Sequence, residues 1–190
     1  KDRFDNLWKE KATGTVSKWE MDSMGFYYGP HELENVNRKE YDIVNFNEMP
    51  EEPVIADVYY YRNQQKPRFV LNRICGTVLD KDRTKHTVTL LTPDGVCDVK
   101  FYAGAFSYWD KQISQIEADG TKKTLEKSWF SRGNKIMVTG FRRGEQWVAK
   151  KYKDSVYNHS VQLIVDIDEK GNLDLKTDRI EVDSANDVAV

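Results

Sequence analysis

The fold of this chain is decided by two segments, residues 74–102, which read ICGTVLDKDRTKHTVTLLTPDGVCDVKFY, and residues 135–152, which read KIMVTGFRRGEQWVAKKY. Apolar and polar residues alternate along both, which is typical of strands that bury one face in a core. In residues 96–102, for example, Cys97, Val99 and Phe101 fall on one side, and Asp98, Lys100 and Tyr102 on the other. The pattern predicts a β-rich domain.

Five strands and one helix are expected in this region and just before it. We place the strands at residues 68–79, 86–92, 96–102, 135–141 and 146–152, and the helix at 103–116, before the fourth strand. Pro93-Asp94-Gly95 and Arg142-Arg143-Gly144-Glu145 supply tight turns. Three strands, a helix and a two-stranded hairpin follow the order of the oligonucleotide/oligosaccharide-binding (OB) fold, a small and partly open β-barrel. The predicted fold class is therefore mainly β, with an OB-type five-stranded barrel.

Two flanking regions complete an expected division into residues 1–65, 66–158 and 159–190. The first is interpreted as an N-terminal helical and extended region that packs on the barrel, with helices at 1–13 and 17–28, a strand at 54–61 and a turn at 63–67. The last is interpreted as an extra C-terminal β-hairpin, with strands at 161–168 and 173–177, followed by a flexible tail. The chain begins with Lys1 rather than Met, and we expect a piece of a longer protein.

Positive charge is concentrated in the expected barrel. Residues 66–158 hold 18 lysines and arginines against 10 acidic residues, a net charge of +8. Residues 1–65 carry 8 against 13, and residues 159–190 carry 3 against 8, so each flank has a net charge of −5. A basic middle between acidic flanks indicates a local site for a polyanion, although ordinary solvated lysines remain the alternative.

The candidate binding residues follow from the barrel. OB barrels bind single strands on the face of strands 2 and 3, between the loops that join strands 1–2 and 4–5; cations follow the phosphates and flat rings stack on the bases. Trp147 is equally compatible with the core, because the parity of its strand is open. The predicted nucleic-acid-binding residues are Lys81, Arg83, Lys85, Lys100, Tyr102, Phe141, Arg142, Arg143, Trp147, Lys150 and Lys151.

Other motifs point to structure rather than chemistry. Tyr59, Tyr60 and Tyr61 could stack on bases, but we expect them to pack on the barrel, since aromatic rings bury large areas. Cys75 and Cys97 are expected to be buried thiols, and His31 a turn residue or helix-end partner. Asp166 and Asp168 share a strand face and could hold a divalent metal, but are interpreted as solvated. The sequence offers no phosphate loop, metal-ligand cluster or nucleophile elbow, so no catalytic residues and no cofactor are assigned to this chain.

Several segments together resemble a known family. They are Ile74-Cys-Gly-Thr-Val78, Val99-Lys-Phe-Tyr102, Trp129-Phe-Ser-Arg-Gly133, Ile136-Met-Val-Thr-Gly-Phe-Arg-Arg143 and, upstream, the element Gly25-Phe-Tyr-Tyr-Gly-Pro-His-Glu-Leu33. Taken in chain order, these segments resemble the C-terminal OB region of the bacterial DNA polymerase III alpha subunit, most of all the versions in Gram-positive bacteria and their phages. The upstream element departs from the family pattern at Pro30 and Glu32.

The resemblance implies a non-catalytic fragment of a replicative DNA polymerase. The parent protein would be a DNA-directed DNA polymerase, a nucleotidyltransferase that uses Mg²⁺ at carboxylates outside this chain. The OB domain would bind single-stranded DNA template, largely without sequence preference. The alternative is a protein-interaction module that docks the sliding clamp, the clamp loader or another polymerase domain. No apolar run is long enough to cross a membrane, and the expected location is cytoplasmic.

Overall fold

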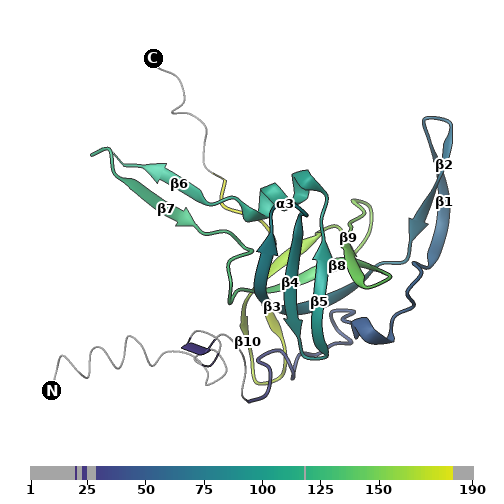
Figure 1. Ribbon diagram of the computed structural model, residues 1–190, viewed down its shortest axis with the longest axis horizontal. Helices are drawn as coiled ribbons and strands as arrows, with labels where there is room; N and C mark the ends of the chain where they lie inside the picture. Colours follow the sequence, from purple (N-terminus) through teal and green to yellow (C-terminus); the bar gives the residue numbers. More distant parts are fainter. Residues whose placement is uncertain (1–19, 21–22, 25–28, 118, 182–190) are drawn as a thin grey trace.

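The computed structural model describes residues 20, 23–24, 29–117 and 119–181 (Figure 1). Its centre is a closed barrel of five strands, β3 (Asn72–Asp82), β4 (Thr87–Thr92), β5 (Gly95–Lys100), β8 (Lys135–Arg143) and β9 (Gln146–Ala149). The strands pair in the order β8-β3-β4-β5-β9, and β9 pairs back with β8 to close the barrel. β5 and β9 run parallel, whereas the other pairs in the barrel are antiparallel. The expected OB-like barrel is confirmed.

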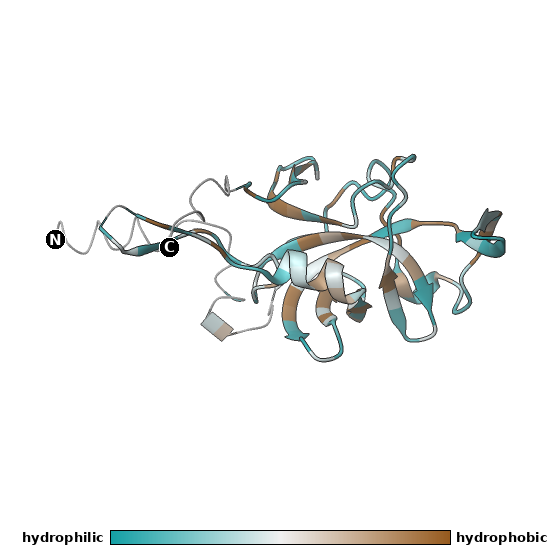
Figure 2. Ribbon diagram, turned by 90° about the horizontal axis from the view of Figure 1, so that it is seen from above, coloured by the Kyte–Doolittle hydropathy of each residue, from teal (hydrophilic) through white to brown (hydrophobic). Residues whose placement is uncertain are grey.

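The barrel core follows from the alternation of side chains along the strands. Val88 and Leu90 of β4 and Val99 of β5 are completely buried. The helix α3 (Ala103–Asp110) covers one end of the barrel with Phe106 and Trp109, and Trp109 stacks on Trp129 with ring centroids 4.5 Å apart. Figure 2 shows the hydrophobic colour concentrated along the barrel strands and the hydrophilic colour at many of the turns. As expected, Cys75 and Cys97 are buried free thiols, and burial raises the pKa of each to about 12.

Gly140 permits the close packing at the β8–β9 corner. A Cβ atom at this position would lie 2.1 Å from the carbonyl oxygen of Val148 and 2.7 Å from Nε1 of Trp147. Real Cβ atoms do not approach other atoms so closely, so a larger residue would push β9 off β8. Glycine in the middle of a strand weakens it locally but allows such an approach between backbones.

The segment before the barrel wraps against the outside of β3 and β8. Leu33, Val36 and Ile43 form a second core cluster with Met137 and Ile164, and the short 3₁₀ helix η1 (Phe46–Glu48) adds Phe46 to the main core. His31 lies in this segment: its Nε2 donates to the carbonyl of Leu91 at 2.8 Å, and its Nδ1 accepts from the amide of Leu33 at 3.0 Å. Burial lowers the pKa of His31, which favours the neutral ring that these two bonds need. The helices expected at 1–13 and 17–28 fall almost wholly outside the described residues.

The C-terminal hairpin extends the barrel sheet. β10 (Val161–Ile167) pairs with β8 and with β11 (Leu173–Lys176), so it continues the sheet beyond the barrel. Val161 and Ile164 of β10 are buried. The predicted hairpin is therefore confirmed, and each of its strands ends one residue earlier than expected.

A separate hairpin, called here the arm, precedes the barrel. It consists of β1 (Ile55–Tyr61) and β2 (Gln64–Phe69), and within the described residues these two strands pair only with each other. Arg62 and Asn63 form its turn with φ angles of 49° and 59°, the left-handed geometry of a two-residue hairpin turn. The expected turn at 63–67 and the single long strand at 68–79 are therefore wrong: the chain turns earlier, and residues 70–71 separate β2 from β3.

The three tyrosines of β1 also differ from expectation. Tyr59, Tyr60 and Tyr61 are 43%, 76% and 49% exposed, so they do not pack on the barrel. The reason is topological, because a hairpin that joins no larger sheet keeps both of its faces outside the core.

A second hairpin replaces the end of the expected helix. α3 ends at Asp110, and β6 (Ile113–Ile116) pairs with β7 (Lys122–Glu126) around a turn in which Gly120 has a φ of 82°. The prediction of a helix to residue 116 is wrong, because Lys111 already has an extended backbone and the following residues pair with β7. The arm and the β6–β7 hairpin project from opposite sides of the barrel (Figure 1).

Candidate nucleic-acid interface

Two predicted cations of the β3–β4 connection are tied to α3. The Nζ of Lys81 binds the carboxylate of Asp110, and Nε of Arg83 donates to the same carboxylate at 2.7 Å. Ser128 Oγ also donates to Asp110, at 2.8 Å. Burial opposes ionisation of Asp110, but the hydrogen bonds from Lys81, Ser128 and Arg83 outweigh it and lower the pKa of this carboxyl. Much of the charge on Lys81 and Arg83 is therefore compensated within the protein.

The next predicted residues lie along the outer face of the sheet. Lys85 is exposed and lies 3.8 Å from the carboxylate of Asp82, and Nζ of Lys100 binds the carbonyl oxygen of Lys85. Beside Lys100, Asp98 accepts a hydrogen bond from Thr89 at 2.7 Å. The face of β4 and β5 thus carries a carboxylate as well as a cation. Tyr102, at the N-terminal end of α3, is 63% exposed.

Arg142 and Arg143 are neighbours in sequence, but the side chain of Arg142 is buried and that of Arg143 is exposed. Arg142 is buried, and its guanidinium donates to the carbonyls of Gly144 (2.8 Å) and Met49 (2.9 Å), with longer bonds to Phe46 and Asn47. It also lies over the Phe46 ring, 4.6 Å from its centroid. Arg142 therefore fastens the η1 segment to the β8–β9 turn, and its guanidinium also lies 3.6 Å from the carboxylate of Glu51.

Phe141 and Trp147 are also inside the molecule. Trp147 is completely buried in the main core, and Phe141, which is 4% exposed, packs its ring against Phe69 of β2 with ring centroids 4.6 Å apart. The parity of β9, which the sequence leaves open, places Trp147 in the core. The burial of Phe141 and Arg142 corrects the expectation that they present their side chains on the surface, and Trp147 takes the core position that the sequence left open.

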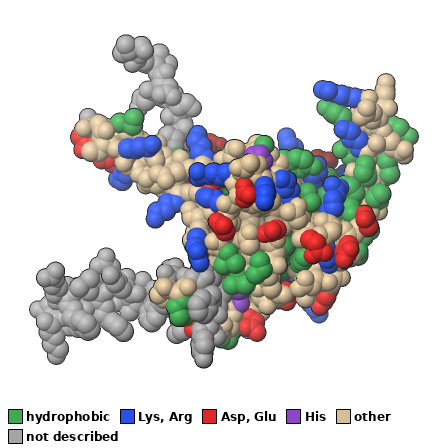
Figure 3. Space-filling model, in the orientation of Figure 1, with side chains coloured by type: hydrophobic (Ala, Val, Ile, Leu, Met, Phe, Trp, Pro, Cys, Tyr) green, Lys and Arg blue, Asp and Glu red, His purple; other side chains and the backbone are tan. Residues whose placement is uncertain are grey.

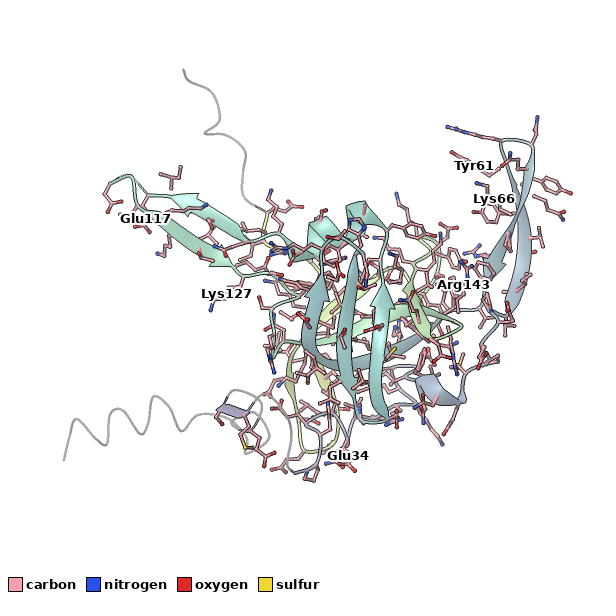
Figure 4. The ribbon with its side chains drawn as sticks, in the orientation of Figure 1. Glu34, Tyr61, Lys66, Glu117, Lys127 and Arg143 are labelled. Carbon is pink, nitrogen blue, oxygen red and sulfur yellow. The ribbon has the colours of Figure 1, made fainter. Side chains whose placement is uncertain are left out.

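Arg143, Lys150 and Lys151 remain at the surface, and Arg143 and Lys150 lie on the side of the barrel that faces the arm. The guanidinium of Arg143 lies 5.4 Å from the ring centroid of Phe141 and 5.8 Å from that of Phe69 in β2. Lys150 follows β9, and Lys151 beside it is exposed. Figure 4 shows Arg143 between the barrel and the arm.

Aromatic rings and cations alternate in one continuous line on this side, called here the row: Tyr102, Lys150, Tyr152 and Arg68. Nζ of Lys150 lies 5.7 Å from the Tyr102 ring centroid and 5.9 Å from that of Tyr152. Arg68 of β2 lies over the other end, 4.5 Å from the Tyr152 centroid. The hydroxyl of Tyr152 accepts the amide of Phe69 at 2.8 Å, which anchors the arm to the barrel.

The row brings together predicted and unpredicted residues. Tyr102 and Lys150 are among the sequence predictions, whereas Tyr152 and Arg68 are not. The sequence does contain a pattern that points to Arg68: Lys66 and Arg68 alternate with Gln65 and Pro67, in a segment that can pair with the tyrosine-rich strand before it. It is readable only once the turn is placed at Arg62-Asn63. Within the described part of the chain, Lys66, Arg68, Arg143 and Lys150 lie within ion-pair distance of no carboxylate.

A contrasting cluster lies near α3 and the β6–β7 hairpin. Glu126 accepts Lys176 Nζ at 2.6 Å, Arg179 Nε at 2.9 Å and Trp129 Nε1 at 3.0 Å. Arg179 is buried and also donates to the carbonyls of Tyr108, Trp109 and Lys127. Burial opposes ionisation of Glu126, but these hydrogen bonds prevail and lower its pKa to about 2. The cations of this cluster are structural.

The described residues contain neither a cluster of metal ligands nor a membrane-spanning helix. Among the described residues, no group of three or more His, Cys, Asp or Glu side chains is placed to hold a metal ion. Asp168 caps the β10–β11 turn by accepting the amides of Lys170 and Asn172, so its carboxylate stabilises the turn. In the same part of the chain, no helix has the length and apolar character needed to cross a membrane.

Comparisons with known proteins give two similar chains. The protein is 47% identical over 175 residues to "Probable DNA polymerase YorL" of Bacillus subtilis (strain 168), and equally to "DNA-directed DNA polymerase" of Bacillus phage SPbeta. Each alignment covers 92% of this chain but only 13% of the relative, so the chain spans about an eighth of the length of these proteins. No protein-family model and no solved structure matches. The protein is therefore similar, over nearly all of its length, to one short segment of proteins named DNA polymerases.

Proposed function

We propose that this chain is a non-catalytic segment of a DNA polymerase, comparable to the C-terminal OB region of polymerase III alpha subunits, and that it binds single-stranded DNA with little sequence preference. The row of Tyr102, Lys150, Tyr152 and Arg68 carries this proposal. Similarity to a segment of two proteins named DNA polymerases supports a nucleic acid as the ligand. Polymerisation and the Mg²⁺ it requires are assigned to other parts of such a polymerase.

The chemistry of the row suits a single strand. Bases stack on aromatic rings whatever their identity, and each stacked base contributes about 1–3 kcal/mol. Phosphates need cations, and the cations of the row lie over rings rather than beside carboxylates. A phosphate can therefore bind Lys150 or Arg68 without breaking an ion pair, whereas at Lys81 or Arg83 it would compete with Asp110.

Fluorescence anisotropy with a labelled oligodeoxythymidine tests the proposal. We expect binding that weakens steeply as salt rises, because phosphate contacts release counterions. Tyr102→Ala combined with Lys150→Ala should lower affinity about tenfold or more, through one lost ring and one lost charge. Oligonucleotides of other sequences should lose affinity to a similar extent.

The matched control removes two cations elsewhere on the surface. Lys127→Ala combined with Lys170→Ala takes away more charge than the test variant, from exposed positions outside the row. Affinity should change by less than about twofold, since charges further apart than the ~10 Å Debye length at 0.1 M salt are largely screened. An equal loss in the control, or affinity that does not fall with salt, contradicts the proposal.

A second function, docking of another replication protein such as a sliding clamp or clamp loader, is proposed for the face of the arm that carries Val58 and Tyr60, called here the outer face. Val58 and Tyr60 are exposed there, and exposed apolar side chains that lie together mark interaction surfaces. Capture of purified clamp or loader subunits in the absence of DNA, lost in a Tyr60→Thr variant, would support it. Capture that Tyr60→Thr leaves unchanged would reject this face.

A further inference from the structure

The arm carries three exposed tyrosines that the row does not use. Tyr59, Tyr60 and Tyr61 follow one another in β1, and none of them is covered by the barrel. A two-stranded hairpin standing by itself is marginally stable, and exposing three rings to water adds little to it. Exposed aromatic surface of this kind is typical of a binding site.

Strand register divides the tyrosines between two faces. Tyr59 pairs with Lys66 and Tyr61 with Gln64, while Asp57 pairs with Arg68. Directly opposed residues of an antiparallel pair lie on the same face. Tyr59 and Tyr61 therefore share one face with Lys66 and Arg68, called here the inner face, and Tyr60 lies on the other face.

The inner face is turned toward the barrel. Arg68 shows this at the base of the arm, because its guanidinium lies over Tyr152, the third member of the row. Figure 4 shows Tyr61 and Lys66 close together on the side of the arm nearer Arg143. Figure 3 shows the outline of the molecule hollowed between the arm and the barrel, with basic side chains on both sides of the hollow.

Cations lie close to the tyrosine rings of this face. Lys66 Nζ is 5.2 Å from the Tyr61 ring centroid, and the guanidinium of Arg62 is 5.3 Å from it. Asp57, the carboxylate of the arm, accepts the amide of Val58 and forms no ion pair with a described residue. The arm therefore repeats the arrangement of the row, with rings for bases and uncompensated cations for phosphates.

We propose that the inner face of the arm is a second wall of the nucleic-acid site, on which Tyr59 and Tyr61 stack against bases of a single strand held between arm and barrel. This inference rests on the proposed function and adds a location and a mode of binding to it. Residues two apart on a strand are about 6.8 Å apart. This is two stacking intervals of about 3.4 Å, so one base fits between the two rings.

The cations near Tyr61 do not block this arrangement. A cation over an exposed ring is held more weakly than a stacked base. A base can therefore displace Lys66 or Arg62 from the ring, and the displaced cation is then close to the phosphates on either side of that base.

The experiment compares neighbouring tyrosines in the full chain. Tyr59→Thr combined with Tyr61→Thr removes both inner rings, and Tyr60→Thr removes the outer one; threonine keeps the β-propensity of the strand. The probe is a labelled oligodeoxythymidine of about 15 nucleotides, near the upper limit of sites on single OB barrels. A separate variant, Tyr59→Phe combined with Tyr61→Phe, keeps both rings and should bind as the unaltered chain does.

We expect the inner-face variant to bind about tenfold or more weakly, with an unchanged salt dependence because no charge is lost. Tyr60→Thr and the Phe variant should stay within about twofold of the unaltered chain. Lys66→Ala should instead make the salt dependence shallower, by a log–log slope of about 0.7. Photocrosslinking with an oligonucleotide containing 5-iodouracil should map to Tyr59 or Tyr61.

Each possible outcome bears on the inference. If the unaltered chain binds but the inner-face variant binds equally well, the inference is overturned and the proposed function stands. An equal or larger effect of Tyr60→Thr also overturns it, since the stacking face would then be the outer one. If the unaltered chain does not bind at low salt, both the proposed function and the inference fail.

Discussion

The two sides of the barrel use their positive charge in opposite ways. Near α3, Lys81 and Arg83 pair with Asp110, and Lys176 and Arg179 pair with Glu126. On the side of the arm, Arg68, Arg143 and Lys150 lie over aromatic rings, and no carboxylate of the described chain pairs with them. Cations are therefore available to a polyanion only where the protein itself does not neutralise them.

The two projecting hairpins repeat this difference. The arm, residues 55–69, holds three cations, one carboxylate and four aromatic residues. The β6–β7 hairpin, residues 113–126, holds two lysines, three acidic residues and no aromatic residue. Lys123 lies 3.1 Å from Glu117, so its charge too is compensated. Similar architecture thus carries different chemistry, which favours the arm as the functional hairpin.

The largest expected effect tests the structural role of the cations near α3. Arg179→Ala leaves Glu126 with one cation fewer and strips three backbone carbonyls of a donor. Removing one partner of a buried ion pair costs about 3–5 kcal/mol. Urea unfolding should show a loss of this order. Lys127→Ala, which removes a nearby exposed cation, should change the free energy of unfolding by less than about 0.5 kcal/mol; equal effects would remove the distinction between buried and exposed cations.

On the side of the arm, Arg142 is expected to act on stability and Arg143 on nucleic-acid binding. Arg142→Ala leaves buried carbonyls of the η1 segment without their charged donor and should lower the free energy of unfolding by about 2–3 kcal/mol. Arg143→Ala should leave stability within about 0.5 kcal/mol but lower oligonucleotide affinity, because its guanidinium is exposed. Unfolding and anisotropy measured on both variants check this, and a reversed pattern would place the functional arginine at 142.

The low pKa of Glu126 predicts an acid-dependent loss of stability. A carboxyl whose pKa falls from 4.5 to about 2 on folding stabilises the protein fully above the unfolded value, and this contribution disappears as pH falls toward 2. We expect a contribution of about 2 kcal/mol, reduced from the full linkage value by partial solvent access. The free energy of unfolding should be measured from about pH 6 down to about pH 2, a range that includes both pKa values. It should depend less steeply on pH in Glu126→Gln than in the unaltered chain. Identical profiles would contradict the assignment.

The smallest expected effect concerns the β6–β7 hairpin. Lys122→Ala combined with Lys123→Ala removes two exposed cations but should change oligonucleotide affinity by less than about twofold, since the acidic residues of the hairpin already repel phosphates. Anisotropy at low salt is the most sensitive test. A loss as large as that from Lys150→Ala would show that DNA contacts both hairpins.

Much of the barrel could be predicted because its signals are local. Val88, Leu90, Cys97 and Val99 alternate with polar residues, and this alone places them on a buried face. The two projecting hairpins, the arm and β6–β7, were harder to predict. Residues 111–116 continue an apolar pattern that suits a helix as well as a strand, and only pairing with β7 decides between them.

The candidate site was predictable in part for the same reason. Lys150 and Tyr102 follow from the order of the barrel strands, but Tyr152 and Arg68 come from outside the expected binding loops. Arg142 illustrates the limit, since a basic residue in a tight turn is usually exposed, yet here the η1 segment folds over it. Such burial depends on a segment almost a hundred residues away in the chain.

The sequence by itself determined the barrel, the C-terminal hairpin and the local surplus of cations. Alternation and composition are properties of consecutive residues, and they do not depend on which strands become neighbours. Only the tertiary structure decided which cations meet carboxylates and which meet rings, and on which face of the arm each tyrosine lies. The physical reason is that ion pairs and cation–aromatic contacts act over a few ångströms. They therefore depend on strand register and on the packing of distant segments, as the pairing of Tyr59 with Lys66 shows.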